Sequence, residues 1–418
     1  MSKAVIDKLK EWGVTCFVFF VPVFFIVNRL DLRVEQEKFY QVMCMVFTSL
    51  FVGNIWITLF ILWNILLYVY GGYSVGSMQI VNCFLFGITF ASARNLFSNK
   101  SLSLIWGPLK LLTAITIFYM IFQVFGIGPL DVYLDSKGVM QENSTCNQLS
   151  GLMHLPAING TFLALVAPIF LFTTPIIGLL MAIPILTCHS SGAILAYFAL
   201  VVFWAWKKSP KKIFAIFAVI SAIAFSAATY MDFKDDKLTY KSRFENWHLV
   251  LKLAWVNPIG YGPDSFRNYN KIKNFVFFSD EDYNPGVVFA PARDGELARF
   301  RYYSPDNGKW LERFGGRVPK HFSGWNEAHN EYLELWFQYG LIGLLLMFLF
   351  VREVRERYVL SDKSRDVLII TGMFIVLAVS SITQFPFHLA RIVGILGIVC
   401  GAFWALTDKN YNQYKGTA

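Results

Sequence analysis

The strongest constraint on this chain is the repeated occurrence of long apolar runs between residue 12 and residue 406. Most are roughly 16 to 22 residues long, the length that a helix needs to cross about 30 Å of hydrocarbon. Hydrophobic residues make up 56% of the 418 residues and charged residues only 16%, so a soluble protein of this size would lack polar surface. The sequence therefore predicts an all-α, polytopic membrane protein.

We expect about twelve transmembrane helices from the lengths of these runs. The spans lie near residues 12–28, 40–53, 54–70, 76–93, 104–126, 157–173, 175–188, 191–206, 212–230, 329–351, 366–384 and 388–406. The alternative for residues 40–70 is one long tilted helix. Two short helices that hinge at Gly53 and Asn54 are favoured, because they keep the basic N-terminus on the same side as the other basic loops.

Two short basic connections set the expected orientation. Residues 207–212 read Lys-Lys-Ser-Pro-Lys-Lys, and residues 352–365 carry five further Lys and Arg residues. The positive-inside rule places both connections, and with them both termini, in the cytoplasm. The chain then divides into spans one to nine (1–230), a large partly helical segment outside the cytoplasm (231–328), and the last three spans with a cytoplasmic tail (329–418).

Charge and cysteine content argue against several classes of protein. The net charge of +9 is concentrated in short loops, where it has a topological role, so we expect no nucleic-acid partner. The six cysteines show no CxxC pair, which indicates neither a zinc site nor a disulfide scaffold, although one bridge between Cys146 and Cys188 stays open. The predicted spans hold few ionisable side chains, apart from Lys110 near a cytoplasmic end. This pattern argues against an ion-coupled transporter.

The first chemically informative stretch of the outer segment is a predicted helix from Ser242 to Trp255 that lies along the membrane surface. Helical spacing puts Arg243 and Trp247 on one face. The guanidinium of Arg243 is suited to bind a phosphate with two parallel hydrogen bonds. The alternative is an interfacial arginine that bonds lipid headgroups or Glu245.

The second informative stretch begins at His329, which we expect at the N-terminus of the tenth span. Tyr332 and Trp336 follow on the same helical face. The neighbouring face carries Glu331, Glu334 and Gln338. A neutral imidazole at this position is able to accept a proton from a sugar hydroxyl, and the alternative is a capping or hydrogen-bonded structural histidine. The sequence contains no HExxH zinc motif.

Three short motifs stand in order along the second half of the chain. Residues 150–160 read Ser-Gly-Leu-Met-His-Leu-Pro-Ala-Ile-Asn-Gly; residues 242–266 contain Ser-Arg, Trp, Gly-Tyr-Gly and Phe; and residues 328–343 contain Ala-His-Asn-Glu-Tyr-Leu and Gly-Leu-Ile-Gly. Their order resembles the Gly-x-x-x-x-Pro-Asn, Arg…Trp…Gly-x-Gly…Phe and His-Asn-x-x-Leu…Gly-x-x-Gly motifs of the bacterial O-antigen ligase and O-antigen polymerase superfamily. The likeness is greatest to an O-antigen ligase.

This resemblance implies a multi-pass glycosyltransferase of the bacterial inner membrane that acts in lipopolysaccharide biosynthesis. It implies a donor glycan on undecaprenyl diphosphate, an acceptor hydroxyl on the lipid A core oligosaccharide, inversion at the anomeric carbon, and an active site that faces the periplasm without a metal or other cofactor. The nearest alternatives are a repeat-unit polymerase and a protein O-oligosaccharyltransferase. More distant alternatives are a lipid-linked oligosaccharide transporter and a non-catalytic membrane scaffold.

The resemblance also implies roles for individual residues. Arg243 would bind the donor diphosphate, His329 would act as the base or orient the acceptor hydroxyl, and Tyr332 would contact substrate. One position departs from the family pattern, since Ser191 in His-Ser-Ser-Gly-Ala stands where the family usually has the Arg of Ser-Arg-Gly-Ala. The missing positive charge is then expected from another residue near the diphosphate, for which the candidates are His189, Lys241 and Arg391.

Overall fold

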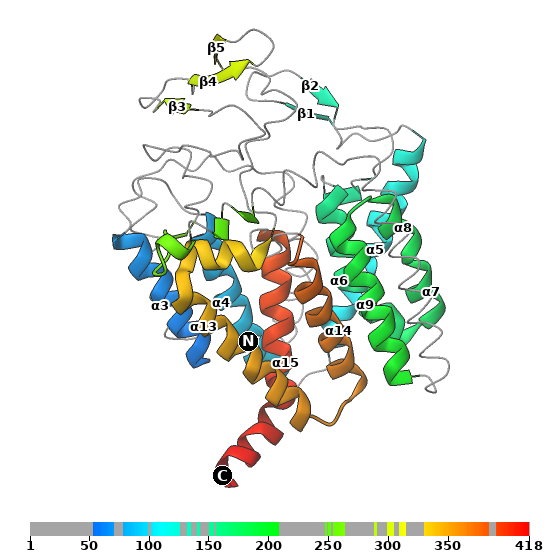
Figure 1. Ribbon diagram of the computed structural model, residues 1–418. Helices are drawn as coiled ribbons and strands as arrows, with labels where there is room; N and C mark the ends of the chain where they lie inside the picture. The colour runs from blue at the N-terminus through cyan, green and yellow to red at the C-terminus, as the bar shows by residue number, and fades with distance from the viewer. Residues whose placement is uncertain are drawn as a thin grey trace, which may run out of the picture.

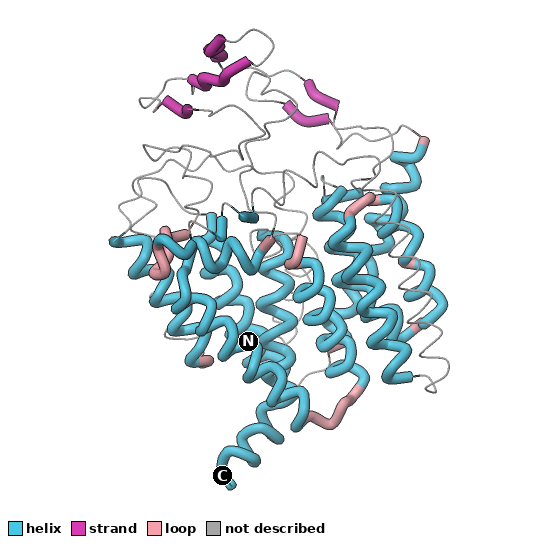
Figure 2. The backbone as a smooth tube through the Cα atoms, in the orientation of Figure 1, coloured by secondary structure: helices cyan, strands magenta, loops and turns pink. Residues whose placement is uncertain are grey.

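The computed structural model is a bundle of helices with short β-strands beyond one end (Figures 1 and 2). It describes residues 53–70, 78–98, 102–125, 132–134, 140–142, 149, 151–153, 156–208, 247–248, 250–251, 254–263, 288–290, 299–304, 309–314, 330–383 and 390–417. The predicted spans at 12–28 and 212–230 lie outside these residues, as does the span at 40–53 except for Gly53.

Most of the described helices coincide with predicted spans. They are α3 (Ile55–Tyr70), α4 (Met78–Phe97), α5 (Ser103–Val124), α6 (Pro156–Thr173), α9 (Ser191–Lys208), α13 (Glu331–Leu360), α14 (Arg365–Ser380) and α15 (Ala390–Thr417). The 3-10 helix η1 (Gly151–Met153) precedes α6. Helices α13 and α15 extend well beyond the predicted C-terminal ends of their spans. The apolar runs therefore located these helices correctly, but they did not predict where α13 and α15 end.

The start of α3 decides between the two predictions for residues 40–70. Gly53 has a φ of 64°, and the Asn54 side-chain oxygen accepts hydrogen bonds from the backbone N–H groups of Trp56 and Ile57, both at 3.1 Å. This is N-cap geometry, which begins a new helix. One continuous helix over residues 40–70 is therefore excluded, and the predicted break at Gly53 and Asn54 is confirmed.

The predicted span at 175–188 is instead two short helices, α7 (Pro175–Leu180) and α8 (Ala182–Thr187). Pro184 has no N–H to donate to the carbonyl of Leu180, and its ring clashes with that carbonyl in a regular helix. The break at Met181 relieves this conflict.

Four of the described helices are long and apolar enough to cross a membrane: α5, α6, α13 and the stretch Ile392–Lys415 of α15. The shorter apolar stretches are Ile55–Tyr68 and Pro175–Thr187. Helices suit this setting because they satisfy their backbone hydrogen bonds internally, where lipid offers no partner. The chain is thus a helical protein with membrane-spanning character.

Two small antiparallel sheets were not part of the all-α prediction. One pairs β1 (Val132–Leu134) with β2 (Met140–Glu142), and the other has the order β3 (Val288–Ala290), β4 (Arg299–Ser304), β5 (Lys309–Phe314). Both lie beyond the same end of the bundle (Figure 2). The sequence carried a hairpin signal here, since Pro-Asp-Asn-Gly at 305–308 separates two aromatic-rich runs. The all-α prediction therefore describes the bundle, and the short strands lie outside the helices.

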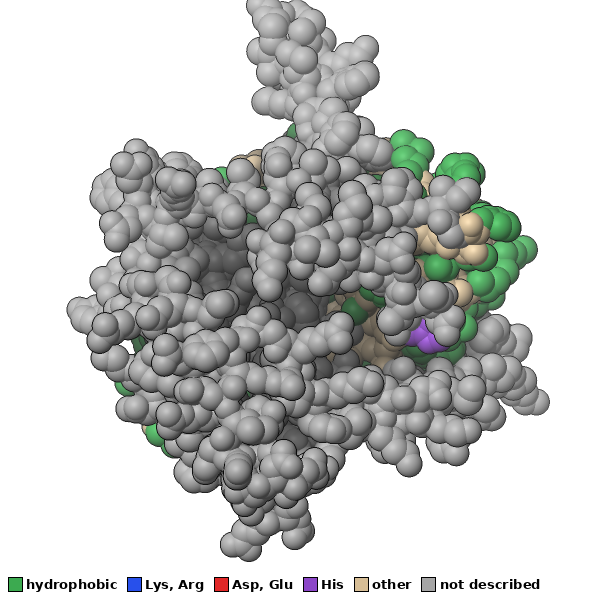
Figure 3. Space-filling model, turned by 90° about the horizontal axis from the view of Figure 1, so that it is seen from above, with side chains coloured by type: hydrophobic (Ala, Val, Ile, Leu, Met, Phe, Trp, Pro, Cys, Tyr) green, Lys and Arg blue, Asp and Glu red, His purple; other side chains and the backbone are tan. Residues whose placement is uncertain are grey.

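The two ends of the bundle differ in charge. We call the end beneath the two sheets the sheet end, and the opposite end the basic end. Described Lys and Arg side chains of the bundle occupy the parts of their helices that meet at the basic end, where for example Lys110 Nζ donates to Thr173 Oγ1 at 3.2 Å. Viewed from the sheet end, the described residues present hydrophobic side chains and a histidine, and none of their Lys, Arg, Asp or Glu side chains is visible (Figure 3).

An ionic network joins three helices at the basic end. Arg357 donates to Glu353 and to Asp408, both at 2.8 Å, and Asp408 also pairs with Arg94 at 2.9 Å. Asn54 Nδ2 donates to the second oxygen of Glu353 at 2.9 Å. The network links α4, α13, α15 and the start of α3, so these elements are held together by bonds between buried or half-buried groups.

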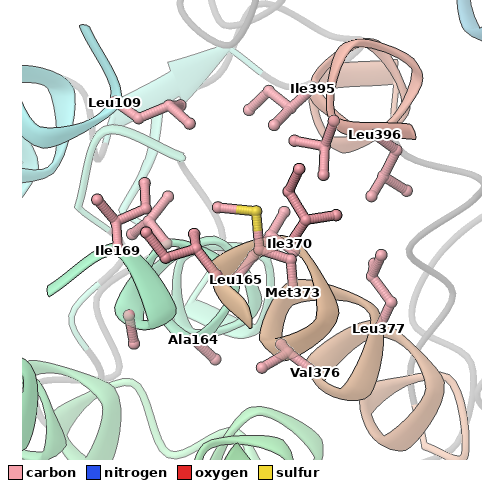
Figure 4. Close-up of a cluster of buried hydrophobic side chains, with 14 of the residues drawn as sticks. Leu109, Ala164, Leu165, Ile169, Ile370, Met373, Val376, Leu377, Ile395 and Leu396 are labelled. Atoms are coloured by element: carbon pink, nitrogen blue, oxygen red, sulfur yellow. The ribbon is translucent and has the colours of Figure 1, made fainter. Parts of the chain in front are cut away.

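The interior of the bundle is apolar. Side chains from α5, α6, α14 and α15 point toward one another, among them Leu109, Leu165, Met373 and Ile395 (Figure 4). Helices α4 and α15 approach closely because Gly401 faces α4, where a Cβ would lie 2.9 Å from the Cβ of Ala93. Close backbone approach at small residues is a common basis of helix packing in membranes.

Candidate functional site

The N-terminal part of α13 is a separate short helix at the sheet end. Asn330 caps it, and its Oδ1 accepts a hydrogen bond from Leu333 N at 3.1 Å. Gly340 interrupts the helix with φ 65° and ψ −166°, so that α13 changes direction along its length (Figure 1). The sequence predicted a helix start at His329, and the described helix begins two residues later, at Glu331. The interruption was not predicted.

Residues 257–262 pack against this interruption, backbone to backbone. Tyr261 N donates to Phe337 O at 3.0 Å, Gly262 N donates to Gln338 O at 2.8 Å, and Leu341 N donates to Pro258 O at 2.8 Å. A helix break leaves backbone groups without helical partners, and in an apolar setting each must find another. The turn from Pro258 to Gly262 supplies these partners.

The helical residues before that turn also pack on α13. Residues 247–248, 250–251 and 254–256 are helical, within the helix predicted from Ser242 to Trp255. Val250 and Phe337 form a buried cluster, and the rings of Trp255 and Trp336 meet edge to face at 4.8 Å. The second and third sequence motifs thus meet at one junction.

Tyr261 adds a stacked aromatic contact to this junction. Its ring lies 4.6 Å from the ring of Phe337, with 21° between the planes. Burial raises the pKa of the Tyr261 phenol above its ordinary value, so the phenol is protonated at neutral pH.

The end of α14 completes the junction. Glu331 N donates to Ser381 O at 2.9 Å, and the hydroxyl of Tyr332 donates to Ala378 O at 2.7 Å. The Tyr332 side chain is 44% exposed. Its ring therefore remains accessible for a substrate contact, while its hydroxyl ties α13 to α14.

A polar face of α13 is buried at this place. Glu331, Glu334 and Gln338 are 0%, 1% and 1% exposed, and Gln338 Nε2 donates to Glu334 Oε1 at 2.9 Å. Helical spacing predicted that these three side chains share a face. It gave no reason to expect their burial, because charged residues at a helix start are usually solvated.

A cavity of about 240 Å³ lies beneath the junction, between α3, α4, α13, α14 and α15. Its lining is mostly apolar, and Glu331, Ser381 and Asn82 contribute polar groups. The hydroxyl of Ser381 is buried and has no hydrogen-bond partner among the described residues. The cavity therefore combines an apolar body with polar groups near the sheet end, which suits an amphiphilic ligand.

The first sequence motif, residues 150–160, lies in the same half of the bundle as Ser191, and the two segments are in contact. A Cβ on Gly160 would lie 3.2 Å from the Cβ atoms of Cys188 and Ser190, so α6 and the start of α9 are in close contact. Asn159 is fully buried, and its Nδ2 donates to Cys188 Sγ at 3.4 Å. Cys188 is a free cysteine, so the disulfide to Cys146 that the sequence left open is not formed.

The predicted site residues are only partly described. Ser191 begins α9, and His189 is exposed in the preceding turn with a φ of 48°. Tyr332 belongs to the α13 junction. The backbone of Arg391 lies in α15, but its side chain is outside the described residues. Also outside them are the two predicted catalytic residues and one candidate cation: Arg243, His329 and Lys241.

Sequence reasoning missed two features of this site, the buried carboxylates of α13 and the cavity beneath them. Among the described residues, no group of three or more His, Cys, Asp or Glu side chains is arranged to hold a metal ion. No known family profile matches the chain, and no curated protein matches it significantly.

Proposed function

We propose that this chain is a membrane glycosyltransferase of the O-antigen ligase type. It transfers a glycan from undecaprenyl diphosphate to a hydroxyl of the lipid A core oligosaccharide. The bundle crosses the bacterial inner membrane about twelve times, as the lengths of its apolar runs suggest. The basic end faces the cytoplasm, and the sheet end faces the periplasm, in accord with the positive-inside rule.

The observation that carries this proposal is the junction between residues 247–262 and the start of α13. Two motifs that resemble the same enzyme family, far apart in sequence, are in direct contact through backbone hydrogen bonds and aromatic rings. Arg243 precedes Trp247 by four residues, and His329 directly precedes Asn330. Chain length alone keeps Arg243 within about 14 Å of Trp247 and His329 within about 4 Å of Asn330, measured between Cα atoms. Contact between the motifs supports a shared site for both residues.

The chemistry follows from these residue types. Arg243 binds the donor diphosphate with two parallel hydrogen bonds, and His329 accepts the proton of the acceptor hydroxyl. The acceptor oxygen attacks the anomeric carbon, a new glycosidic bond forms, and the bond from that carbon to the phosphate oxygen breaks. The electron pair leaves with undecaprenyl diphosphate, and attack from the opposite side inverts the anomeric carbon. His189, Lys241 or Arg391 supplies the cation that Ser191 does not.

The cavity beneath the junction suits the lipid carrier. Its apolar lining offers a place for isoprenoid units, and the Glu331 carboxylate in that lining offers hydrogen-bond acceptors for sugar hydroxyls. The carboxylate of Glu331 is a poor partner for a diphosphate because the charges repel. It therefore favours an arrangement in which the sugar, and not the phosphate, lies nearest to α13.

The test is reconstitution of the purified chain with a lipid diphosphate-linked glycan and lipid A core, in the presence of a chelator. Mass analysis of the product should show the glycan on the core. His329→Ala and Arg243→Ala should each abolish transfer, while Lys409→Ala, at an exposed position of α15 at the basic end, should leave it unchanged. Normal transfer by His329→Ala would refute the catalytic proposal.

The products separate the alternatives. Glycan on the lipid A core indicates a ligase. Longer carrier-linked chains without a modified core indicate a repeat-unit polymerase, and glycan on added protein acceptors indicates a protein O-oligosaccharyltransferase. Movement of the lipid-linked glycan across a vesicle membrane without any transfer indicates a transporter.

A further inference from the structure

The basic end carries a cation that no described carboxylate neutralises. Lys207, at the end of α9, has its Nζ 4.0 Å from the centroid of the Trp206 ring and 5.7 Å from that of the Tyr358 ring. Within the described part of the chain, this ammonium makes neither a hydrogen bond nor an ion pair to protein. Its three N–H donors are therefore available to a ligand, while the two rings restrict where it points.

A second ammonium stands at the same ring. Lys363 Nζ lies 4.1 Å from the centroid of Tyr358 and donates to Val359 O, Ser361 O and Ser361 Oγ at 3.0 to 3.2 Å. These bonds cap the C-terminus of α13 and use all three donors of Lys363. Its charge still adds to the positive potential around Lys207. Burial lowers the pKa of Lys363, and the positive charge of Lys207 lowers it further.

The nearby acid offsets this charge only in part. Asp362, next to Lys363, is exposed and accepts a hydrogen bond from Ser364 N at 2.9 Å. Its field raises the pKa of Lys363, but this effect is smaller than the two that lower it. A local net positive charge therefore remains where the end of α9 lies beside the loop after α13.

Trp206 gives this spot the character of a membrane interface. Its side chain is 59% exposed at the end of an apolar helix. Tryptophan is enriched at the level of lipid headgroups, and basic pockets between helices on the cytoplasmic side bind anionic headgroups. A ligand here would meet an ammonium with free donors beside an exposed indole.

We propose that the basic end binds the phosphate of an anionic phospholipid. The site is formed by Trp206, Lys207 and Tyr358, with Lys363 beside them. The phosphate accepts hydrogen bonds from Lys207, and the indole of Trp206 packs against the glycerol region of the lipid. This site lies at the opposite end of the bundle from the α13 junction, so it does not depend on the proposed glycosyl transfer.

The test measures lipid binding to the purified full chain in detergent by native mass spectrometry. Phosphatidylglycerol should bind more tightly than phosphatidylcholine. Lys207→Gln should weaken phosphatidylglycerol binding about fivefold, the loss expected for one lysine near an anionic surface. Lys207→Arg should retain binding because it keeps the charge.

A matched control variant distinguishes a specific lipid-binding site from a general effect of positive charge. Lys409→Gln removes one exposed cation from the same end of the bundle and should leave binding unchanged. Tryptophan fluorescence during heating shows whether each variant folds like the parent. Equal binding by Lys207→Gln and the parent would overturn the proposal. So would an equal loss in Lys409→Gln, or complete displacement of the lipid by millimolar inorganic phosphate.

Discussion

Gly260 and Gly340 lie backbone to backbone at the sheet end of the bundle. Both have positive φ, 100° and 65°, and a Cβ on Gly260 would lie 2.5 Å from Gln338 O and 2.6 Å from Gly340 N. A Cβ on Gly340 would collide with the backbone of Pro258 and Ile259. Each glycine therefore makes room for the turn that the other requires.

This contact predicts that Gly260→Ala and Gly340→Ala are strongly destabilising. A left-handed backbone costs a residue with a side chain about 1 kcal/mol, and the clash with backbone adds roughly 1–3 kcal/mol. Thermal unfolding in detergent measures the effect. Gly107→Ala is the control, since a Cβ there would meet no atom within 4 Å. Equal melting temperatures for all three variants would contradict the contact.

The ionic network at the basic end predicts that two Arg→Gln substitutions differ in how much they lower the stability of the fold. Arg357 is 4% exposed, bonds to Glu353 and Asp408, and lies over the rings of Trp404 and Tyr411. Arg357→Gln removes the cation that pairs with Glu353 and leaves Asp408 with Arg94 alone. Breaking a buried ion pair in this way typically costs about 3–5 kcal/mol.

Arg352→Gln is the matched control for Arg357→Gln. Arg352 pairs with Glu356 at 2.9 Å, but its side chain is 64% exposed. An exposed pair of this kind contributes about 0–1 kcal/mol. Unfolding measurements on both variants in the same detergent check the prediction, which fails if the two variants lose similar stability.

The N-cap at Asn330 predicts a link between helix geometry and transfer. Asn330→Ala removes the hydrogen bond to Leu333 N and should cost about 1 kcal/mol of stability. Because His329 directly precedes the cap, glycan transfer should fall by more than this stability loss explains. Asn330→Ser retains a capping oxygen and should keep most of both. If Asn330→Ala transfers glycan at the parental rate, the cap does not position the site.

The free thiol of Cys188 predicts a labelling pattern. The side chain is 1% exposed and packed beside Asn159 and the carbonyl of Pro184. A maleimide should not modify Cys188 in the folded protein, and should modify it after denaturation without any reductant. Peptide mass spectrometry identifies the labelled residue. Labelling that requires a reductant would indicate a disulfide instead.

Local sequence signals located much of the fold. The apolar runs identified the helices, and Gly53 with Asn54 identified the start of α3 because a capping side chain acts within its own turn. Other local signals were present but not used. Pro184 accounts for the break between α7 and α8, and the turn residues at 305–308 indicate the hairpin of β4 and β5.

The candidate site was predictable only in part, because its residues come from distant segments. The face shared by Glu331, Glu334 and Gln338 follows from helical spacing alone. Their burial depends on the helices and the turn that surround α13, and no local pattern reports those neighbours. The same holds for Tyr332, whose hydroxyl bonds to Ala378 of α14.

By itself, the sequence determined a helical membrane protein, the positions of its apolar helices, and the break at Gly53 and Asn54 where α3 begins. These features follow from hydrocarbon thickness and from hydrogen bonds within single turns, which act over a few residues. Only the tertiary structure decided that α13 breaks at Gly340, that its carboxylates are buried, and that residues 257–262 fill the break. Those outcomes require backbone contact between segments far apart in the chain, where the partner of each hydrogen bond is set by packing and not by neighbouring residues.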